Sequence, residues 1–128
     1  MFQRHGRDSS RAQATAEHRR REDAAPRLRE QAPRLLSLRL SLEEKRQDSS
    51  SSTRTYVRPI VVSTAPAYFE LRCTEPKCDG RHDITQEILE GIVQGREVIT
   101  GESPCNGMDN NQLCDCTLTY LCQATYTP

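Results

Sequence analysis

Hydrophobic and polar residues alternate most regularly in a short leucine-rich segment. Between residues 36 and 42 a leucine stands at every second position, with serine or arginine between, as Leu36, Leu38, Leu40 and Leu42. Strict alternation places all four side chains on one face of a strand, whereas a helix would distribute them around its circumference. The segment therefore predicts a half-buried strand. Helix is the alternative, because leucine is a good helix former.

Further segments rich in β-branched and aromatic residues predict more strands, at 55 to 64, 67 to 72, 97 to 100 and 117 to 126. Pro59 interrupts the first of these. Since proline has no N–H to donate to a neighbouring strand, this strand is expected at a sheet edge or a bulge. We expect the leucine strand and the next two strands to form an antiparallel meander.

The segment from 84 to 94 has the spacing of an amphipathic helix. Its apolar residues recur on one side, as Ile84, Ile88, Leu89, Ile92 and Val93. Asp83 is a good N-cap, Gln86 completes a capping box, and Gly95 supplies a C-terminal stop. Gly91 weakens the helix interior but permits close packing on the sheet.

These elements predict an α+β fold, with an antiparallel sheet of about four to five strands packed on one helix. The residues expected to face inward form one apolar set. It comprises Leu36, Leu38, Leu40, Val62, Phe69, Leu71, Ile88, Leu89, Ile92, Leu118 and Tyr120.

Residues 1 to 33 lack any apolar stripe and contain Pro26 and Pro33, which interrupt a helix. We expect a disordered or frayed basic leader there, followed by the folded domain at 34 to 128. The two halves of the chain also differ in net charge. Residues 1 to 54 carry a net charge of +5 and residues 55 to 128 carry −5, as counted from Lys and Arg against Asp and Glu.

All six cysteines lie between Cys73 and Cys122. The chain has no apolar run of about 20 residues and no signal peptide, which predicts a cytoplasmic protein without a membrane segment. Clustered cysteines in a reducing compartment favour metal binding over disulfides. Zinc prefers four tetrahedral thiolate or imidazole ligands presented by two tight turns.

The proposed ligands of one structural zinc ion are Cys73, Cys78, Cys105 and Cys114, with each neighbouring pair forming one turn. Cys116 could replace Cys114, because a Cys-x-Cys turn can direct either sulfur inward. Cys122 is expected to be a small buried hydrophobe in the last strand. His82 is an alternative ligand, although a surface position or a supporting role is the main expectation.

The order of a strand, a cysteine turn, a helix, a second cysteine turn and a strand resembles zinc-ribbon domains over residues 71 to 126. The first and second cysteine gaps, of four and eight residues, are longer than is usual there. The pattern Cys-x4-Cys-x-Gly-x-His-Asp, followed by Cys-x-Gly and a later Cys, also resembles small bacterial proteins without an assigned activity.

The sequence contains no nucleotide-binding loop, nucleophile elbow or His-Glu-x-x-His motif. A closed four-cysteine site leaves no position for a reactive water. We therefore expect a non-enzymatic zinc-stabilised module that binds a protein partner. The charge of −5 in residues 55 to 128 disfavours nucleic acid. The alternative is a thiol-based redox or enzyme-accessory protein without a structural metal.

Overall fold

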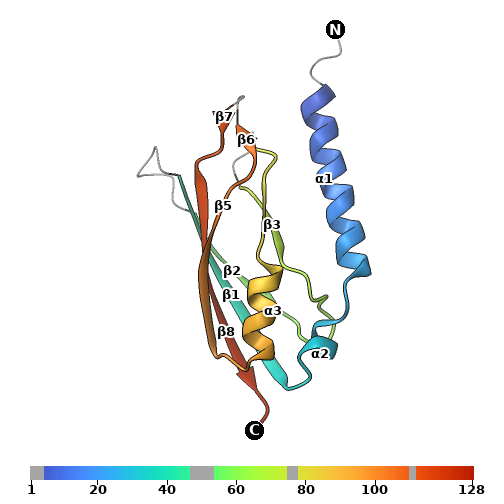
Figure 1. Ribbon diagram of the computed structural model, residues 1–128, viewed down its shortest axis with the longest axis vertical. Coiled ribbons are helices and arrows are strands. Elements are labelled where there is room, and N and C mark those ends of the chain that lie inside the picture. Colours follow the sequence, from blue (N-terminus) through green and yellow to red (C-terminus); the bar gives the residue numbers. More distant parts are fainter. Residues whose placement is uncertain (1–4, 47–53, 75–77, 110–111) are drawn as a thin grey trace.

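The computed structural model describes residues 5–46, 54–74, 78–109 and 112–128. Its centre is a four-stranded antiparallel sheet (Figure 1). The strand order is β2-β1-β8-β5, with bounds Arg54–Ile60, Leu35–Arg46, Cys116–Tyr126 and Val98–Pro104. This confirms the predicted α+β class and the antiparallel sheet. β2 is an edge strand, as expected from Pro59.

Two small hairpins and three helices complete the described chain. The hairpins pair β3 (Glu70–Arg72) with β4 (Arg81–Asp83), and β6 (Met108–Asp109) with β7 (Gln112–Leu113). The helices are α1 (His5–Ala24), α2 (Leu28–Gln31) and α3 (Thr85–Val93). α3 lies against the sheet, and α1 runs along the molecule beside it (Figure 1). None of the described helices is both long and apolar enough to cross a membrane.

The predicted meander is wrong, because the second neighbour of β1 is the last strand of the chain. Leu38, Leu40 and Leu42 lie opposite Ala124, Cys122 and Tyr120 of β8. This pairing extends along nearly the whole of both long strands, whereas β3 has only three residues and pairs with β4. The longer partner therefore takes the central position beside β1.

Burial of β1 follows the predicted alternation, with one exception. Leu38, Leu40 and Leu42 are buried, but Leu36 is 57% exposed. An irregularity in the pairing of β1 with β8 lies between Leu35 and Ser37, and it shifts the alternation by one position. Leu35 is buried in place of Leu36, so the prediction for Leu36 was wrong.

Helix α3 covers one face of the sheet with Ile88 and Ile92, which are buried, and Leu89, which is partly buried. Val93 is 63% exposed, so its assignment to the apolar stripe was wrong. A Cβ atom on Gly91 would lie 2.5 Å from Ile99 Cγ1, which confirms that this glycine permits close packing.

The ends of α3 are determined by local hydrogen bonds. Asp83 Oδ1 accepts the Thr85 N–H at 3.1 Å, although the cap position itself is Ile84 and not Asp83. The side chain of Gln86 donates to Glu90 Oε1 within the helix and not back to the cap residue, so the predicted capping box is wrong. Gly95 has φ +79°, and the N–H groups of Gly95 and Arg96 donate to the carbonyls of Ile92 and Gly91. This is a Schellman ending, as the glycine predicted.

The rest of the predicted inward set lies in or against the core. Phe69, Leu71, Leu118 and Tyr120 are buried, Val62 packs against the core, and Cys122 is fully buried within it. The expectation that Cys122 is a buried hydrophobe is therefore confirmed.

The predicted boundary at residue 34 divides a packed region. Leu28 is 0% exposed and Ala32 is 5% exposed, and both belong to the core. The Leu28 N–H donates to the Ala65 carbonyl at 2.9 Å. By contrast, α1 contacts the domain through polar pairs, from His18 and Arg21 to Glu70 and from Thr15 to Arg81, and through the ring of His18 on that of Tyr68. That α1 frays in solution stays a prediction, but the packed domain includes Leu28.

Candidate metal centre

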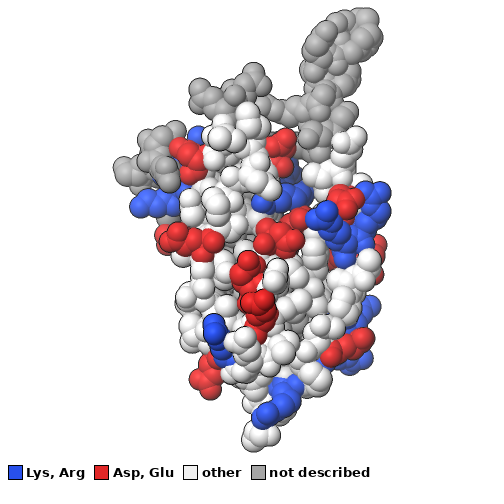
Figure 2. Space-filling model, viewed as in Figure 1, with Lys and Arg blue, Asp and Glu red and all other residues white. Residues whose placement is uncertain are grey.

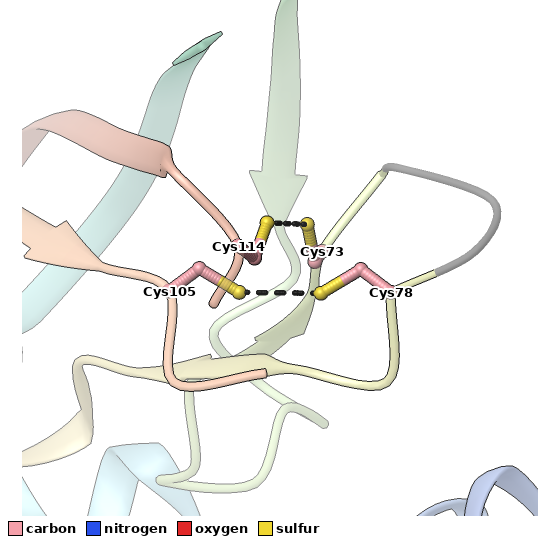
Figure 3. Close-up of side chains that lie close together, drawn as sticks. All are labelled: Cys73, Cys78, Cys105 and Cys114. Carbon is pink, nitrogen blue, oxygen red and sulfur yellow. Dashed lines mark hydrogen bonds between the residues drawn. The ribbon is translucent and has the colours of Figure 1, made fainter. Parts of the chain in front are cut away.

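Four cysteines from three parts of the chain converge at one end of the molecule. Cys73 directly follows β3, Cys78 precedes β4, Cys105 directly follows β5, and Cys114 lies between β7 and β8. Their sulfur atoms all lie within 4.8 Å of one another, and they point toward one another in Figure 3. The structure therefore brings together the four residues that the spacing predicted.

The distances between these sulfurs suit a tetrahedral metal site. Cys73 Sγ lies 3.9 Å from Cys114 Sγ, and Cys78 Sγ lies 3.4 Å from Cys105 Sγ. A tetrahedral ion with Zn–S bonds of about 2.3 Å requires sulfur separations of about 3.8 Å. A disulfide requires about 2.05 Å. All six cysteines lie in the described part of the chain, and none of them forms a disulfide.

Two short loops of the form Cys-x-Gly supply Cys78 and Cys105. The Gly80 N–H donates to Cys78 Sγ at 3.2 Å, and the Gly107 N–H donates to Cys105 Sγ at 3.4 Å. Backbone donors aimed at sulfur stabilise the thiolate, which is the form that binds metal. We call residues 78–80 and 105–107 the two knuckles.

The two knuckles are held together by a reciprocal exchange of hydrogen bonds. Asp79 Oδ1 accepts the Met108 N–H, and Asn106 Oδ1 accepts the Arg81 N–H, each at 3.0 Å. Each central residue therefore bonds to the backbone just beyond the other knuckle. This arrangement fixes the distance between Cys78 and Cys105 without any metal.

The other two cysteines form backbone hydrogen bonds with the glycines of the two knuckles. The Cys73 N–H donates to the Gly80 carbonyl, and the Cys114 N–H donates to the Gly107 carbonyl, each at 3.0 Å. Cys73 thus joins the knuckle at 78–80, and Cys114 joins the one at 105–107. The predicted division into a 73/78 turn and a 105/114 turn agrees with these bonds.

Both Cys-x-Gly triplets are part of the pattern noted in the sequence, but the role of their central residues, Asp79 and Asn106, was not predicted. A Cys-x-Gly triplet with Asp or Asn at its centre occurs at 78–80 and again at 105–107. This repeat was the available signal, because Asp and Asn side chains commonly bond to nearby backbone N–H groups. The exchange between the two loops depends on the tertiary fold and is not visible in either triplet alone.

Cys116, the alternative to Cys114, lies outside the group of four converging sulfurs. It is buried at the start of β8, and its carbonyl accepts the Cys105 N–H at 2.9 Å. Burial raises the pKa of the Cys116 thiol, and the neighbouring thiols of Cys114 and Cys73 raise it further. Cys116 supports the Cys105 loop through its backbone.

The thiols of the four-cysteine group differ in acidity. Burial raises the pKa of Cys78 to about 12, against the opposing effect of the Gly80 N–H. Burial also raises the pKa of Cys114, but hydrogen bonds from Cys116, Cys78 and Cys105 outweigh it and leave this pKa below its usual value. Cys114 is therefore more acidic than Cys78.

His82, the other alternative ligand, is buried beside the cysteines but takes no part in the four-sulfur group. Its Nδ1 lies 3.2 Å from Ser103 Oγ, and its Nε2 lies 3.9 Å from Glu44 Oε1. Burial lowers the pKa of His82, against the carboxylate of Glu44 and the Ser103 contact, which raise it. Glu44 is only 2% exposed, although it lies in a charged run of the sequence from Glu43 to Arg46.

The donor set can hold a soft or borderline metal ion, for which zinc is the ordinary choice with four thiolates. Comparison with known proteins adds nothing to this. The chain matches no protein-family model, no curated protein and no solved structure. The resemblance to a zinc ribbon therefore rests on the cysteine pattern and on the geometry of the site.

Proposed function

We propose that this chain is a non-enzymatic interaction module in which Cys73, Cys78, Cys105 and Cys114 bind one structural zinc ion. The observation that carries the proposal is the convergence of four sulfurs at separations close to those of a tetrahedral zinc site. The knuckle hydrogen bonds support it, because they orient the cysteines before any metal is bound.

The character of the ligand set favours a structural role over a catalytic one. Four thiolates fill the coordination of zinc, whereas catalytic zinc retains a position for water or substrate. Cys73, Cys78 and Cys114 are buried, and Cys105 is partly exposed. Such a site contributes to folding, and zinc binding in finger peptides is worth roughly 10 to 16 kcal/mol at neutral pH.

The ion would connect parts of the chain that the sheet does not connect. Cys73 and Cys78 belong to the β3–β4 hairpin, which lies outside the main sheet, while Cys105 and Cys114 adjoin β5 and β8 of that sheet. Zinc would therefore anchor the hairpin to the sheet at this end of the molecule.

Surface composition favours a protein partner. Met108 and Leu113, in the small hairpin between two of the cysteines, are 41% and 78% exposed. Met108 and Leu113 pair across β6 and β7, and adjacent exposed apolar side chains are typical of protein contacts. Figure 2 shows acidic side chains over α3 and mixed charges around α1. Together with the charge of −5 in residues 55 to 128, this gives little support for phosphate binding.

The test begins with the full chain purified under reducing conditions and freed of loosely bound metal. Elemental analysis is expected to show zinc retained by the wild type and lost by Cys78→Ser and Cys105→Ser. Cys122→Ser is the matched control, since this cysteine lies in the apolar core and should leave zinc in place. The proposal would be contradicted if the wild type bound no zinc and melted cooperatively at the same temperature with and without added zinc.

A partner that depends on the zinc-stabilised surface should be captured by zinc-loaded wild type and not by Cys78→Ser. Substitution of Leu113 by Ser provides the second arm, because it alters the exposed hairpin and none of the ligands. Loss of capture in this variant, with zinc retained, would assign the contact to the hairpin. Equal capture by all three proteins would exclude this surface.

The alternative function, thiol-based redox chemistry without a metal, is favoured by one observation. The pKa of Cys114 lies below its usual value, despite the burial that raises it, because of its hydrogen bonds to neighbouring cysteines. A low thiol pKa promotes oxidation and nucleophilic attack. Rapid alkylation of Cys114 in metal-free protein, together with reversible disulfide formation, would support this alternative. Protection of Cys114 by stoichiometric zinc supports the structural role.

A further inference from the structure

A second group of metal-ligating side chains adjoins the four cysteines. It consists of Glu44 from β1, His82 from β4 and Cys73, which also belongs to the first group. One donor atom from each lies within 4.8 Å of the others. The three side chains are 2%, 1% and 2% exposed, in that order. A carboxylate, an imidazole and a thiol thus meet in the protein interior.

The imidazole of His82 is oriented as in a metal ligand. Within the part of the chain that the structure describes, its Nε2 makes no hydrogen bond, although the atom is fully buried. Its Nδ1 lies at hydrogen-bond distance from Ser103 Oγ, 3.2 Å away. Histidines that bind metal through one nitrogen usually donate the other N–H to an acceptor of this kind. A buried nitrogen without a partner is costly, and a metal ion would satisfy it.

Glu44 raises a separate electrostatic problem. Its Oε1 lies 3.0 Å from Cys73 Sγ, and both of its oxygens accept the Thr74 N–H, at 3.2 and 3.1 Å. When Cys73 binds zinc as a thiolate, the carboxylate faces a second anion in a buried environment. Like charges repel strongly there, because water screens them little.

We propose that Glu44, His82 and Cys73 bind a second zinc ion, with the Cys73 sulfur bridging the two metal positions. This inference rests on the proposed function, since it assigns the first ion to the four cysteines. The second ion would satisfy His82 Nε2 and separate the carboxylate from the thiolate. Oxygen, nitrogen and sulfur donors together suit zinc, whereas calcium and magnesium require oxygen donors.

The balance of charge supports two ions over one. Four thiolates and the Glu44 carboxylate are five negative groups, and one divalent ion balances only two of them. Buried uncompensated charge is unfavourable. A second divalent ion leaves a single excess negative charge. Three protein donors leave one position of a tetrahedral zinc ion unfilled, but the full burial of all three ligands leaves no open approach to it for a substrate.

The experiment uses the full chain loaded with isotopically enriched cadmium, which replaces zinc and is observable by NMR. Two cadmium signals are expected. Both should correlate with the β-protons of Cys73, and one of them should correlate with the ring protons of His82. These correlations are measured in the wild type, so the result does not depend on any variant that folds poorly.

Variants then test the assignment by elemental analysis of zinc-loaded protein. Glu44→Gln and His82→Gln are expected to bind one equivalent where the wild type binds two. Glu43→Gln is the matched control, because the neighbouring carboxylate is exposed on the same strand and should leave two equivalents. The four-cysteine cadmium signal should persist in Glu44→Gln.

Each other result has a definite meaning. One equivalent in the wild type, with a cadmium signal that correlates only with cysteines, overturns the second position and leaves the proposed function intact. Two equivalents in both wild type and Glu44→Gln would place the second ion elsewhere and also overturn the inference. No bound metal at all would overturn the proposed function itself.

Discussion

The backbones of Gly80 and Gly107 are in direct contact, with the two knuckles facing each other. A Cβ atom on Gly80 would lie 2.7 Å from the Gly107 nitrogen, and one on Gly107 would lie 2.7 Å from Cys78 Sγ. Neither position leaves room for a methyl group, since the nearest atoms belong to backbone and to proposed ligands. The approach of the two loops, and hence the spacing of the sulfurs, requires glycine at both sites.

Gly107→Ala should therefore weaken zinc binding and destabilise the fold. Excess volume in a packed site typically costs about 1 to 3 kcal/mol. We expect zinc affinity, measured by competition with a chromophoric chelator, to fall about tenfold or more, which corresponds to about 1.4 kcal/mol.

The control for that variant is Gly95→Ala. Gly95 has φ +79° and nothing lies within 4 Å of its Cβ position, so alanine strains the backbone without contacting the site. It should lower the free energy of unfolding by about 1 to 2 kcal/mol and leave zinc affinity unchanged. An unaltered affinity in Gly107→Ala would show that the close approach of the knuckles is not needed for metal binding.

The second prediction compares two leucines of β1 that differ in burial. Leu38 is 3% exposed and Leu36 is 57% exposed on the same strand. Leu38→Ala should cost about 2 to 5 kcal/mol of unfolding free energy, as should Ile88→Ala in α3. Leu36→Ala should cost less than about 0.5 kcal/mol. Urea denaturation measures all three, and equal losses for the two leucine variants would refute the bulge at Leu35.

Truncation tests where the packed domain begins. Removing residues 1–24 deletes α1, which contacts the domain through polar pairs with Glu70 and one ring contact with Tyr68, and exposed polar pairs contribute about 0.2 to 1 kcal/mol each. This truncation should therefore lower stability only slightly. Removing residues 1–33 also deletes Leu28 and Ala32 from the core and should cost a further 2 to 5 kcal/mol, roughly. Similar stability of the two truncated proteins would support the predicted boundary at residue 34.

Alkaline pH should reveal the environment of Tyr68. Burial, together with the carboxylate of Glu70, raises its pKa to about 12, from about 10 in the unfolded chain. Its contribution to stability is therefore complete below pH 10 and is lost as the pH rises from about 10 to 12. Burial also raises the pKa of Tyr56, Tyr120 and Tyr126, so ultraviolet titration of the wild type should show late ionisation that is reduced, but not abolished, in Tyr68→Phe. That variant should also lose less stability across this pH range than the wild type.

Much of the sheet could be predicted because the alternation of apolar and polar residues within a strand is a local property of the sequence. Alternation identified the inward faces of β1 and β8, and the Asp83-to-Gly95 signals located α3. The pairing of β1 with β8 could not be predicted in the same way, since it joins segments about 80 residues apart. The exposure of Leu36 likewise depends on a register irregularity, which the sequence of β1 alone does not specify.

The candidate metal centre shows the same division between local and tertiary information. The four cysteines could be chosen from their spacing, but the knuckle exchange and the burial of His82 arise from tertiary packing. The burial of Glu44 could have been predicted, since this residue continues the inward alternation of Leu38, Leu40 and Leu42. A charged residue is ordinarily expected at the solvated surface, but the two-residue period of the strand places Glu44 on its inward face.

X-ray absorption spectroscopy at the zinc edge, on the full chain loaded with one equivalent of zinc, tests the central claim most directly. The account predicts that the ion has four sulfur neighbours at about 2.3 Å, because the four cysteines form the complete site. Cys105→Ser should lose this signature. A first zinc ion coordinated mainly by oxygen and nitrogen, or a protein that retains no zinc, would contradict the account.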